Sequence, residues 1–173
     1  GVRRARRGGV ALTPEREKGW PRGGGHGNEV GRNGALCGHA MAGRNGWSWT
    51  RRQMAAEHTD YPDAGFDMVS SDAVLHELPV QATEAVLREA FRVLAPGGVI
   101  LMEDVPPYRE ISDFRFILSD WETEGRGEPY WREEGNLDRT ELCRRIGFVN
   151  VDEFGLDEET KYPWMLRAVK PAS

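Results

Sequence analysis

The sequence predicts an α/β fold with a mostly parallel sheet over residues 54–173, preceded by an irregular segment over residues 1–53. The first observation is a change of composition, because residues 1–53 carry a net charge of +8 and 13 of the 21 glycines, whereas the remainder carries −13. The second is a pair of apolar runs that flank a helical stripe, as in a βαβ unit. The third is a further pair of apolar runs near the end, close enough for an antiparallel pair of strands.

The overall composition argues against membrane-spanning and secreted proteins. The chain has 173 residues, 39% of them hydrophobic and 29% charged, with a net charge of −5, which is typical of a soluble protein. No run approaches the roughly 18 apolar residues of a membrane span, and the basic N-terminus lacks the apolar stretch of about 7–15 residues of a secretory signal. Cys37 and Cys143 are isolated, which predicts reduced thiols and a cytoplasmic protein. The chain opens on Gly1, which suggests a fragment.

Residues 1–53 are predicted to be irregular or disordered. Their large apolar side chains stand singly among Gly, Arg and Asn, and no helical or strand period connects them. The glycine run at 23–27 contains the spacing of a nucleotide-binding loop, but no apolar strand precedes it and no helix follows, so we interpret it as chance glycine richness. The abrupt change at residue 54 suggests that this segment is not the native partner of the rest, as after a shifted reading frame or a misjoined fragment.

A basic cluster lies at the start of this segment. Lys and Arg clusters attract phosphates whatever the base sequence. Here no aromatic residue is interleaved with the arginines, and no nucleic-acid-binding module is recognisable. We therefore expect a solvated tail and no nucleic-acid partner. The cluster consists of Arg3, Arg4, Arg6 and Arg7.

The predicted βαβ unit consists of a strand over residues 66–71, a helix over 82–94 and a second strand over 99–102. The first strand is a short apolar run that ends in two serines, as a buried parallel strand would. The helix has apolar side chains at spacings of three and four. Residues 96–98 read Pro-Gly-Gly, which ends the helix because Pro cannot continue it and Gly accepts a positive φ.

The remaining elements complete a layered α/β domain. A helix is predicted over residues 110–123, followed by a loop over 124–136 that is rich in Gly, Pro and charge. Asp138 and Glu141 have the spacing of a capping box, which predicts a helix that Gly147 ends. Two final apolar runs, at 148–154 and 164–169, predict the antiparallel strands.

The four histidines do not predict a metal site. His76-Glu77 could open the HExxH motif of a zinc protease, but Val80 stands where the second imidazole is needed. The other histidines show no ligand spacing either. We therefore expect no bound metal.

Three polar segments are expected to gather at one edge of the sheet, because ligands bind outside the carboxyl ends of parallel strands. The first, Ala56-Glu57-His58, precedes the first predicted strand. The other two, at 71–77 and 103–108, follow the first and second strands.

These segments resemble the middle motifs of class I S-adenosylmethionine-dependent methyltransferases. The likeness begins with AEHTDYPD at 56–63 and FDMV at 66–69, and continues with LREAFRVLAPGG at 87–98. Residues 137–148 and the last two strands resemble the C-terminal helix and β-hairpin of that family. The likeness covers residues 54–171, and the joint spacing of its motifs is more specific than any one of them.

The resemblance implies a Rossmann-like methyltransferase sheet of seven strands, of which this chain offers the last four. The sheet is therefore expected to be incomplete, without the first strands, the glycine loop and the acidic residue that holds the ribose. Ala55 also stands where the family often has Asp or Asn. S-adenosylmethionine is the implied cofactor, and we expect its binding by this chain to be impaired.

The resemblance also implies roles for particular residues. Ala56, Glu57 and His58 would border the adenine, and the donor pocket would be lined by Ser71, Asp72 and His76. Methyl transfer from a sulfonium mainly requires that donor and acceptor be positioned. His76 could serve as a base, although hydrogen bonding at the strand end is its default role.

A small-molecule acceptor would be recognised by residues 107–131, which are rich in aromatic side chains. Two of these, Phe114 and Trp121, could equally dock their helix on the sheet. We expect acceptor contacts from residues in loops. The candidates are Tyr108, Glu128, Tyr130 and Trp131.

Two other functions share the predicted fold. A non-catalytic α/β remnant or binding module would keep the layers and lack the cofactor loop. A nicotinamide-dependent oxidoreductase would also use a parallel sheet, but it needs the same glycine loop. Binding of S-adenosylmethionine distinguishes the enzyme from the remnant.

Overall fold

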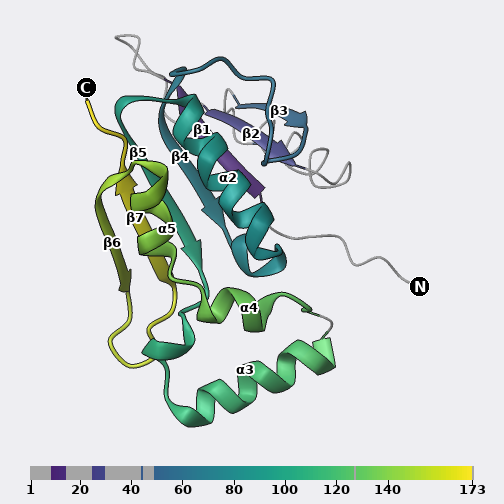
Figure 1. Cartoon of the computed structure of the whole chain (residues 1–173). Helices are drawn as coiled ribbons and strands as arrows, with labels where there is room; N and C mark the ends of the chain where they lie inside the picture. The colour runs from purple at the N-terminus through teal and green to yellow at the C-terminus, as the bar shows by residue number, and fades with distance from the viewer. Residues whose placement is uncertain (1–8, 15–24, 30–43, 45–48, 127, 173) are drawn as a thin grey trace.

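A computed structural model describes residues 9–14, 25–29, 44, 49–126 and 128–172 (Figure 1). The basic cluster at 3–7, Cys37 and the start of the glycine run lie outside the described residues. Among the residues that are described, no helix combines the length and the apolar character that a bilayer crossing requires.

The predicted four-stranded sheet is confirmed. Strand β4 (Phe66–Asp72) runs parallel to β5 (Leu94–Asp104), which establishes the βαβ unit. Strand β7 (Trp164–Val169) lies antiparallel to β5 on one side and to β6 (Val149–Gly155) on the other. The order of these strands in the sheet is β4-β5-β7-β6.

Three short strands extend this sheet beyond β4, a difference from the irregular segment predicted for residues 1–53. They are β1 (Gly9–Pro14), β2 (Gly25–Glu29) and β3 (Trp49–Gln53), and the full order is β3-β2-β1-β4-β5-β7-β6. Strand β1 is antiparallel to both β2 and β4, whereas β2 is parallel to β3. Their sequences lack apolar periodicity, so successive pairing outward from the edge of β4, rather than a local pattern, places them in the sheet.

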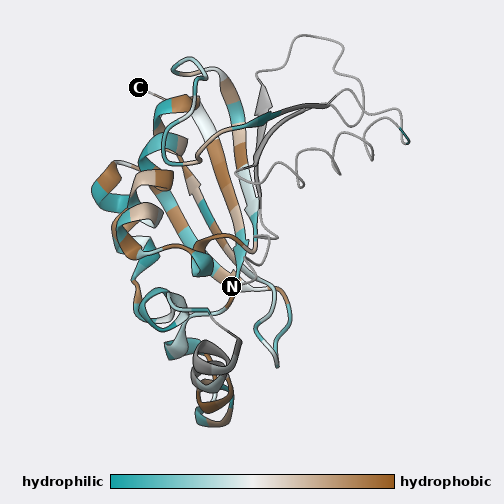
Figure 2. Cartoon of the chain, turned by 90° about the vertical axis from the view of Figure 1, so that its right-hand side faces the viewer, coloured by the Kyte–Doolittle hydropathy of each residue, from teal (hydrophilic) through white to brown (hydrophobic). Residues whose placement is uncertain are grey.

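Helix α2 (Val80–Val93) covers one face of the sheet and forms the core with it. Its apolar stripe turns Val86, Leu87 and Ala90 inward, and all three are buried. Val69 and Ile100 meet this stripe from β4 and β5. In Figure 2 the helices that follow β4 stand on one side of the sheet.

Strand β5 begins earlier than the sequence predicts, directly after α2. Its first residue, Leu94, pairs with Phe66, and the regular register resumes only where Met68 pairs with Val99. The Pro-Gly-Gly segment between them forms an irregularity in the strand, in which Gly97 has a φ of +82° and its N–H donates to the carbonyl of Lys170. Glycine accepts this backbone conformation without the strain of a side chain.

The segment after β5 crosses the carboxyl edge of the sheet (Figure 1). It contains a short 3-10 turn, η2 (Tyr108–Glu110), and then helix α3 (Asp113–Arg126). The alternative that α3 docks on the sheet is wrong, because Phe114 is 70% and Trp121 68% exposed. The spacing of these apolar side chains specifies a helix but not the surface on which it packs.

Helix α4 (Trp131–Asn136) lies where a loop was predicted, and α5 (Arg139–Ile146) follows it. The N-terminal cap of α5 is confirmed, since the Asp138 carboxylate accepts a hydrogen bond from the backbone N–H of Glu141. Gly147 ends the helix in the left-handed conformation, as predicted. Leu142 of α5 is buried in the same core as α2.

Candidate active site

The carboxyl ends of the strands meet at one edge of the sheet, as the sequence predicts. Asp72, the last residue of β4, pairs with Glu103 of β5, and Glu103 pairs in turn with Met165 of β7. On the other side of β4, Asp72 pairs with Gly9. Strand β1 therefore brings its amino end, and not its carboxyl end, to this edge.

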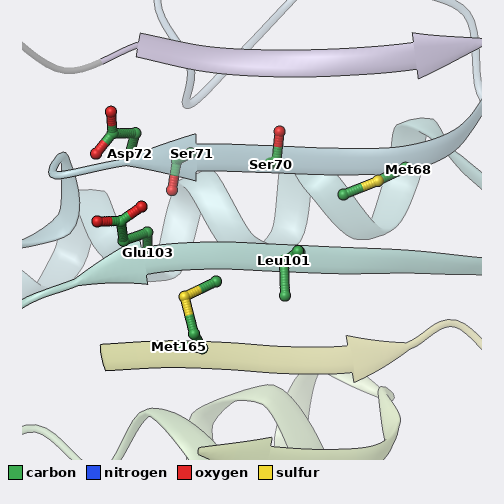
Figure 3. A pocket seen from close by; sticks show the side chains of 7 residues that line it. All are labelled: Met68, Ser70, Ser71, Asp72, Leu101, Glu103 and Met165. Carbon is green, nitrogen blue, oxygen red and sulfur yellow. The ribbon is translucent and has the colours of Figure 1, made fainter. Parts of the chain in front are cut away.

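A pocket of about 290 Å³ opens on the face of the sheet that α2 does not cover. Figure 3 shows the Asp72 and Glu103 carboxylates side by side at its rim, at the tips of neighbouring strands. Apolar side chains and two serines form the rest of its wall. The lining residues are Met68, Ser70, Ser71, Asp72, Leu101, Glu103 and Met165.

The two carboxylates give this pocket a negative charge. Partial burial raises the pKa of Glu103, and the neighbouring charges of Asp72 and Asp104 raise it further. Of the predicted donor-pocket residues, Ser71 and Asp72 both line the pocket. The Ser71 hydroxyl is buried and donates to Sδ of Met102, 2.9 Å away.

His76 lies just beyond this edge, in the 3-10 turn η1 (Leu75–Glu77) that follows β4. Its Nδ1 is 2.7 Å from Oδ1 of Asp104, the last residue of β5. Asp104 also accepts hydrogen bonds from the backbone N–H groups of Leu75 and Val105, so its carboxylate is held on three sides. This buried pair joins the ends of the two parallel strands.

The protonation states in this pair follow from burial and charge. Burial would raise the pKa of Asp104, but the hydrogen bond and the charge of His76 outweigh it, and the pKa lies below its usual range. Burial would lower the pKa of His76, but Asp104, with Glu77 and Glu128 nearby, raises it. The ionised Asp104 carboxylate therefore accepts a hydrogen bond from the Nδ1–H group of His76. Nε2 is the ring nitrogen that this hydrogen bond does not use.

Helix α4 also contacts His76, through the ring of Trp131. The Trp131 ring, at the first position of this helix, packs against the imidazole with 4.8 Å between ring centroids. Glu128 is half-buried in the segment just before α4 and lies close to His76 and Glu77. The structure thus brings together three predicted residues, His76, Glu128 and Trp131, that are far apart in the sequence.

Buried charges anchor α4 to the rest of the domain. Glu134 is fully buried and accepts a hydrogen bond from the Thr83 hydroxyl of α2. Burial raises the pKa of Glu134 to about 7, although Thr83 and Arg139 act in the opposite direction. Arg139 is itself 1% exposed, with Nε 3.8 Å from carboxylate oxygens of both Glu134 and Glu153.

Tyr108 packs against α4 and is not among the residues that line the pocket. Its ring is buried and packs edge-on against Phe116, with 4.8 Å between centroids. On the other side it lies against Gly135 of α4, where an added Cβ would stand only 2.9 Å from the ring. We therefore correct the predicted acceptor contact of Tyr108 to a packing contact beneath the helix.

The predicted adenine segment follows β3, and its residues are not among those that line the pocket. Ala56 is partly buried and packs against the core, Glu57 is half-buried and His58 is exposed. Thr59, the next residue, is tied to α2 because its N–H and hydroxyl both donate to Glu89. Tyr130 is half-buried beside Trp131.

The sequence prediction did not single out Asp104, Glu134 or Arg139. The signal for Asp104 was its position at the end of a predicted parallel strand, next to the strand that His76 follows. Glu134 and Arg139 gave no such signal, because a charged residue in a polar segment looks solvated until its distant partners are known.

Comparisons with known proteins agree with this geometry. A family model described as a methyltransferase domain matches residues 36–102, which begins within the N-terminal segment and ends in β5. The resemblance to class I methyltransferases is confirmed. An arsenite methyltransferase of Aquipseudomonas alcaligenes is 34% identical over 91 residues, which are 51% of this chain and 24% of that protein.

Solved structures of methyltransferases share the fold. Phosphoethanolamine N-methyltransferase 2 of Haemonchus contortus, in complex with S-adenosyl-L-methionine, superposes with a TM-score of 0.65 at 15% identity, covering 84% of this chain and 43% of the other. A methyltransferase of Methanosarcina mazei gives 0.63 at 16% identity, covering 87% and 83%. The fold that this chain shares with them is a Rossmann-like α/β sheet with a C-terminal antiparallel hairpin. The chain spans about a fifth to a quarter of the length of the curated relatives it matches.

Proposed function

We propose that this chain functions as an S-adenosylmethionine-dependent methyltransferase that acts on a small-molecule acceptor. The observation that carries the proposal is the acidic pocket at the carboxyl ends of β4 and β5, in a fold shared with methyltransferases. Ligands of open α/β sheets bind at this edge. The assignment of the pocket to the donor is our inference from that position.

The residues of the pocket fit the donor in their chemistry. S-adenosylmethionine supplies an activated methyl group on a sulfonium, which carries a positive charge. Asp72 and Glu103 provide negative charge at the rim, and Met68, Leu101 and Met165 provide apolar contacts. The pocket is small for a ligand site, since such sites measure about 300–1,000 Å³.

We also propose that cofactor affinity in this chain is reduced. Two observations support this. Ala55 offers no carboxylate or amide near the predicted adenine segment. Because β1 is antiparallel to β4, its carboxyl end lies at the edge opposite the pocket, where Pro14 pairs with Phe66. A glycine loop after the first strand would have to be at the pocket edge.

The acceptor is proposed to bind between the strand ends and α4. Trp131 offers an aromatic face there, held in place by His76. Tyr130 and Glu128 flank it from the same segment. These residues would orient the acceptor, which is the main requirement of an in-line methyl transfer. Where the acceptor atom carries a proton, His76 is the candidate base, although hydrogen bonding at the strand end, here to Asp104, is its default role.

A cytoplasmic location is part of this proposal. Cys143, the described cysteine, is a free thiol in the core, and burial raises its pKa to about 12. Such a thiol is inert as a nucleophile and needs no oxidising compartment.

Calorimetric titration with S-adenosylmethionine, and in parallel with S-adenosylhomocysteine, which lacks the sulfonium charge, tests the cofactor site. We expect saturable binding that Asp72→Asn weakens about tenfold, since a hydrogen bond to a charged group is worth about 1.5–3 kcal/mol. Asp152→Asn is the matched control, because Asp152 lies on β6 and pairs with Arg167 away from the pocket. No heat at millimolar ligand would overturn the enzyme proposal and favour a non-catalytic α/β module.

A further inference from the structure

One group of ligand-forming side chains stands out among the described residues. His76, Glu77 and Glu128 each offer one atom that could bind a metal ion, and these atoms lie within 4.8 Å of one another. The group is not a patch of surface carboxylates, because His76 is buried and both glutamates are half-buried. About fifty residues separate Glu128 from the other two, so the fold creates this group.

A second observation concerns the orientation of the imidazole. Asp104 is 1% exposed and is hydrogen-bonded to Nδ1 of His76 at 2.7 Å. Because Nδ1 is engaged by the Asp104 carboxylate, Nε2 is the ring nitrogen that remains for a ligand. Metal-binding histidines are almost always held in this way, with a carboxylate or carbonyl behind the ring. The Trp131 ring restricts the imidazole further.

The spacing of the three ligand atoms is close to that of a metal site. In a tetrahedral site with bonds of about 2.1 Å, two ligand atoms are about 3.4 Å apart. The observed limit of 4.8 Å therefore requires the ligand atoms to approach one another by up to about 1.4 Å, which rotation of the two glutamate side chains can supply.

We propose that His76, Glu77 and Glu128 form a binding site for a divalent transition-metal ion, with Asp104 as the residue that positions His76. One imidazole and two carboxylates suit Zn²⁺, Mn²⁺ or Co²⁺ and leave coordination positions open to water or to an oxygen of a bound small molecule. This site goes beyond the proposed methyl transfer and does not depend on it. The sequence predicted no metal site because only residues close together along the chain were compared. Such a comparison cannot detect Glu128, which lies about fifty residues from His76 and Glu77.

Titration of the untagged chain with Co²⁺, without any cofactor, tests the site. Visible absorption reports the coordination of Co²⁺, and Zn²⁺ should displace it. We expect one equivalent to bind, and Glu128→Gln to weaken the affinity at least tenfold. Glu133→Gln is the matched control, because Glu133 is an exposed residue of α4 that does not belong to the group.

The positioning role of Asp104 has its own variant. Asp104→Asn is expected to weaken Co²⁺ binding by about 10–100-fold and to change its absorption spectrum, since the imidazole loses its orientation. His76→Gln, which removes the imidazole and leaves Asp104 in place, should abolish the spectrum.

Two results would overturn the proposal. One is the absence of a bound-Co²⁺ spectrum at millimolar metal. The other is binding that Glu128→Gln and Glu133→Gln weaken equally, because that would indicate non-specific association with surface carboxylates. Both readouts are independent of S-adenosylhomocysteine binding, so they stand apart from the test of the proposed function.

Discussion

The two faces of the central sheet come from the same strands but carry different residues. On β5, Ile100 and Met102 are fully buried in the core with α2 and α5, whereas Leu101 and Glu103, which alternate with them along the strand, line the pocket. A strand alternates its side chains between faces, so one strand can hold the core and build a site at the same time. Changes on one face should therefore alter stability, and changes on the other should alter binding.

The largest effect on the free energy of unfolding is expected from one of two adjacent aliphatic residues of β5, Ile100 and Leu101. Ile100→Ala should cost about 2–5 kcal/mol, because Ile100 is fully buried and the change leaves a cavity. Leu101→Ala, on the pocket face, should cost about 1 kcal/mol, since Leu101 is only half-buried. Urea denaturation measures both. Equal losses would show that the two faces do not differ in this way.

A smaller effect is expected from pH, through Glu134 on the covered side. An unfolded glutamate ionises near pH 4.5, whereas burial raises the pKa of Glu134 to about 7 in the folded protein. Between these values the unfolded chain has lost the proton that the folded chain keeps, so stability falls as the pH rises from 4.5 to 7. The loss is at most about 3 kcal/mol.

Glu134→Gln tests this contribution, since glutamine keeps an acceptor for Thr83 without the charge. We expect the variant to be more stable than the parent at pH 8, and the difference to disappear near pH 4. Urea denaturation of both proteins at a series of pH values measures the difference in the free energy of unfolding at pH 8 and near pH 4. The exposed neighbour provides the control, and Glu133→Gln should follow the parent at every pH. A parent-like slope in Glu134→Gln would assign the pH dependence to other groups.

The smallest effect concerns the start of α5, one of the helices on the covered face. Asp138→Ala removes the hydrogen bond to the Glu141 N–H and should cost about 1 kcal/mol. Asp138→Asn should restore most of this, because asparagine caps helices about as well as aspartate. Thermal denaturation distinguishes the two. The pocket face should not respond, so S-adenosylhomocysteine affinity is expected to be equal in both variants.

The parts of the fold that were predicted correctly have local causes. The stripe of α2 and the Asp138 cap are set by residues three and four positions apart, which a sequence shows directly. Helix α4 was missed because its buried residue, Glu134, is charged, and its partners Thr83 and Arg139 come from other helices. Strand β1 was missed because its place depends on the edge of β4.

The site shows the same division. Asp72 and His76 were predicted because they follow a parallel strand, and the structure brings both to the expected edge. Asp104 required the register between β4 and β5, which parallel pairing fixes but the sequence does not state. The closeness of Glu128 to His76 depends on the path of the segment before α4, which no local pattern specifies.

The contact between Gly135 and Tyr108 has a consequence for the opening above the strand ends. The distance between α4 and η2 is as short as it is because position 135 has no side chain. Even a methyl group at position 135 would clash with the Tyr108 ring, and we expect α4 to move outward in response. This movement would carry Trp131, at the start of α4, away from His76. If the acceptor binds beside Trp131 as proposed, the depth of its site would therefore depend on position 135, a residue outside the proposed acceptor contacts.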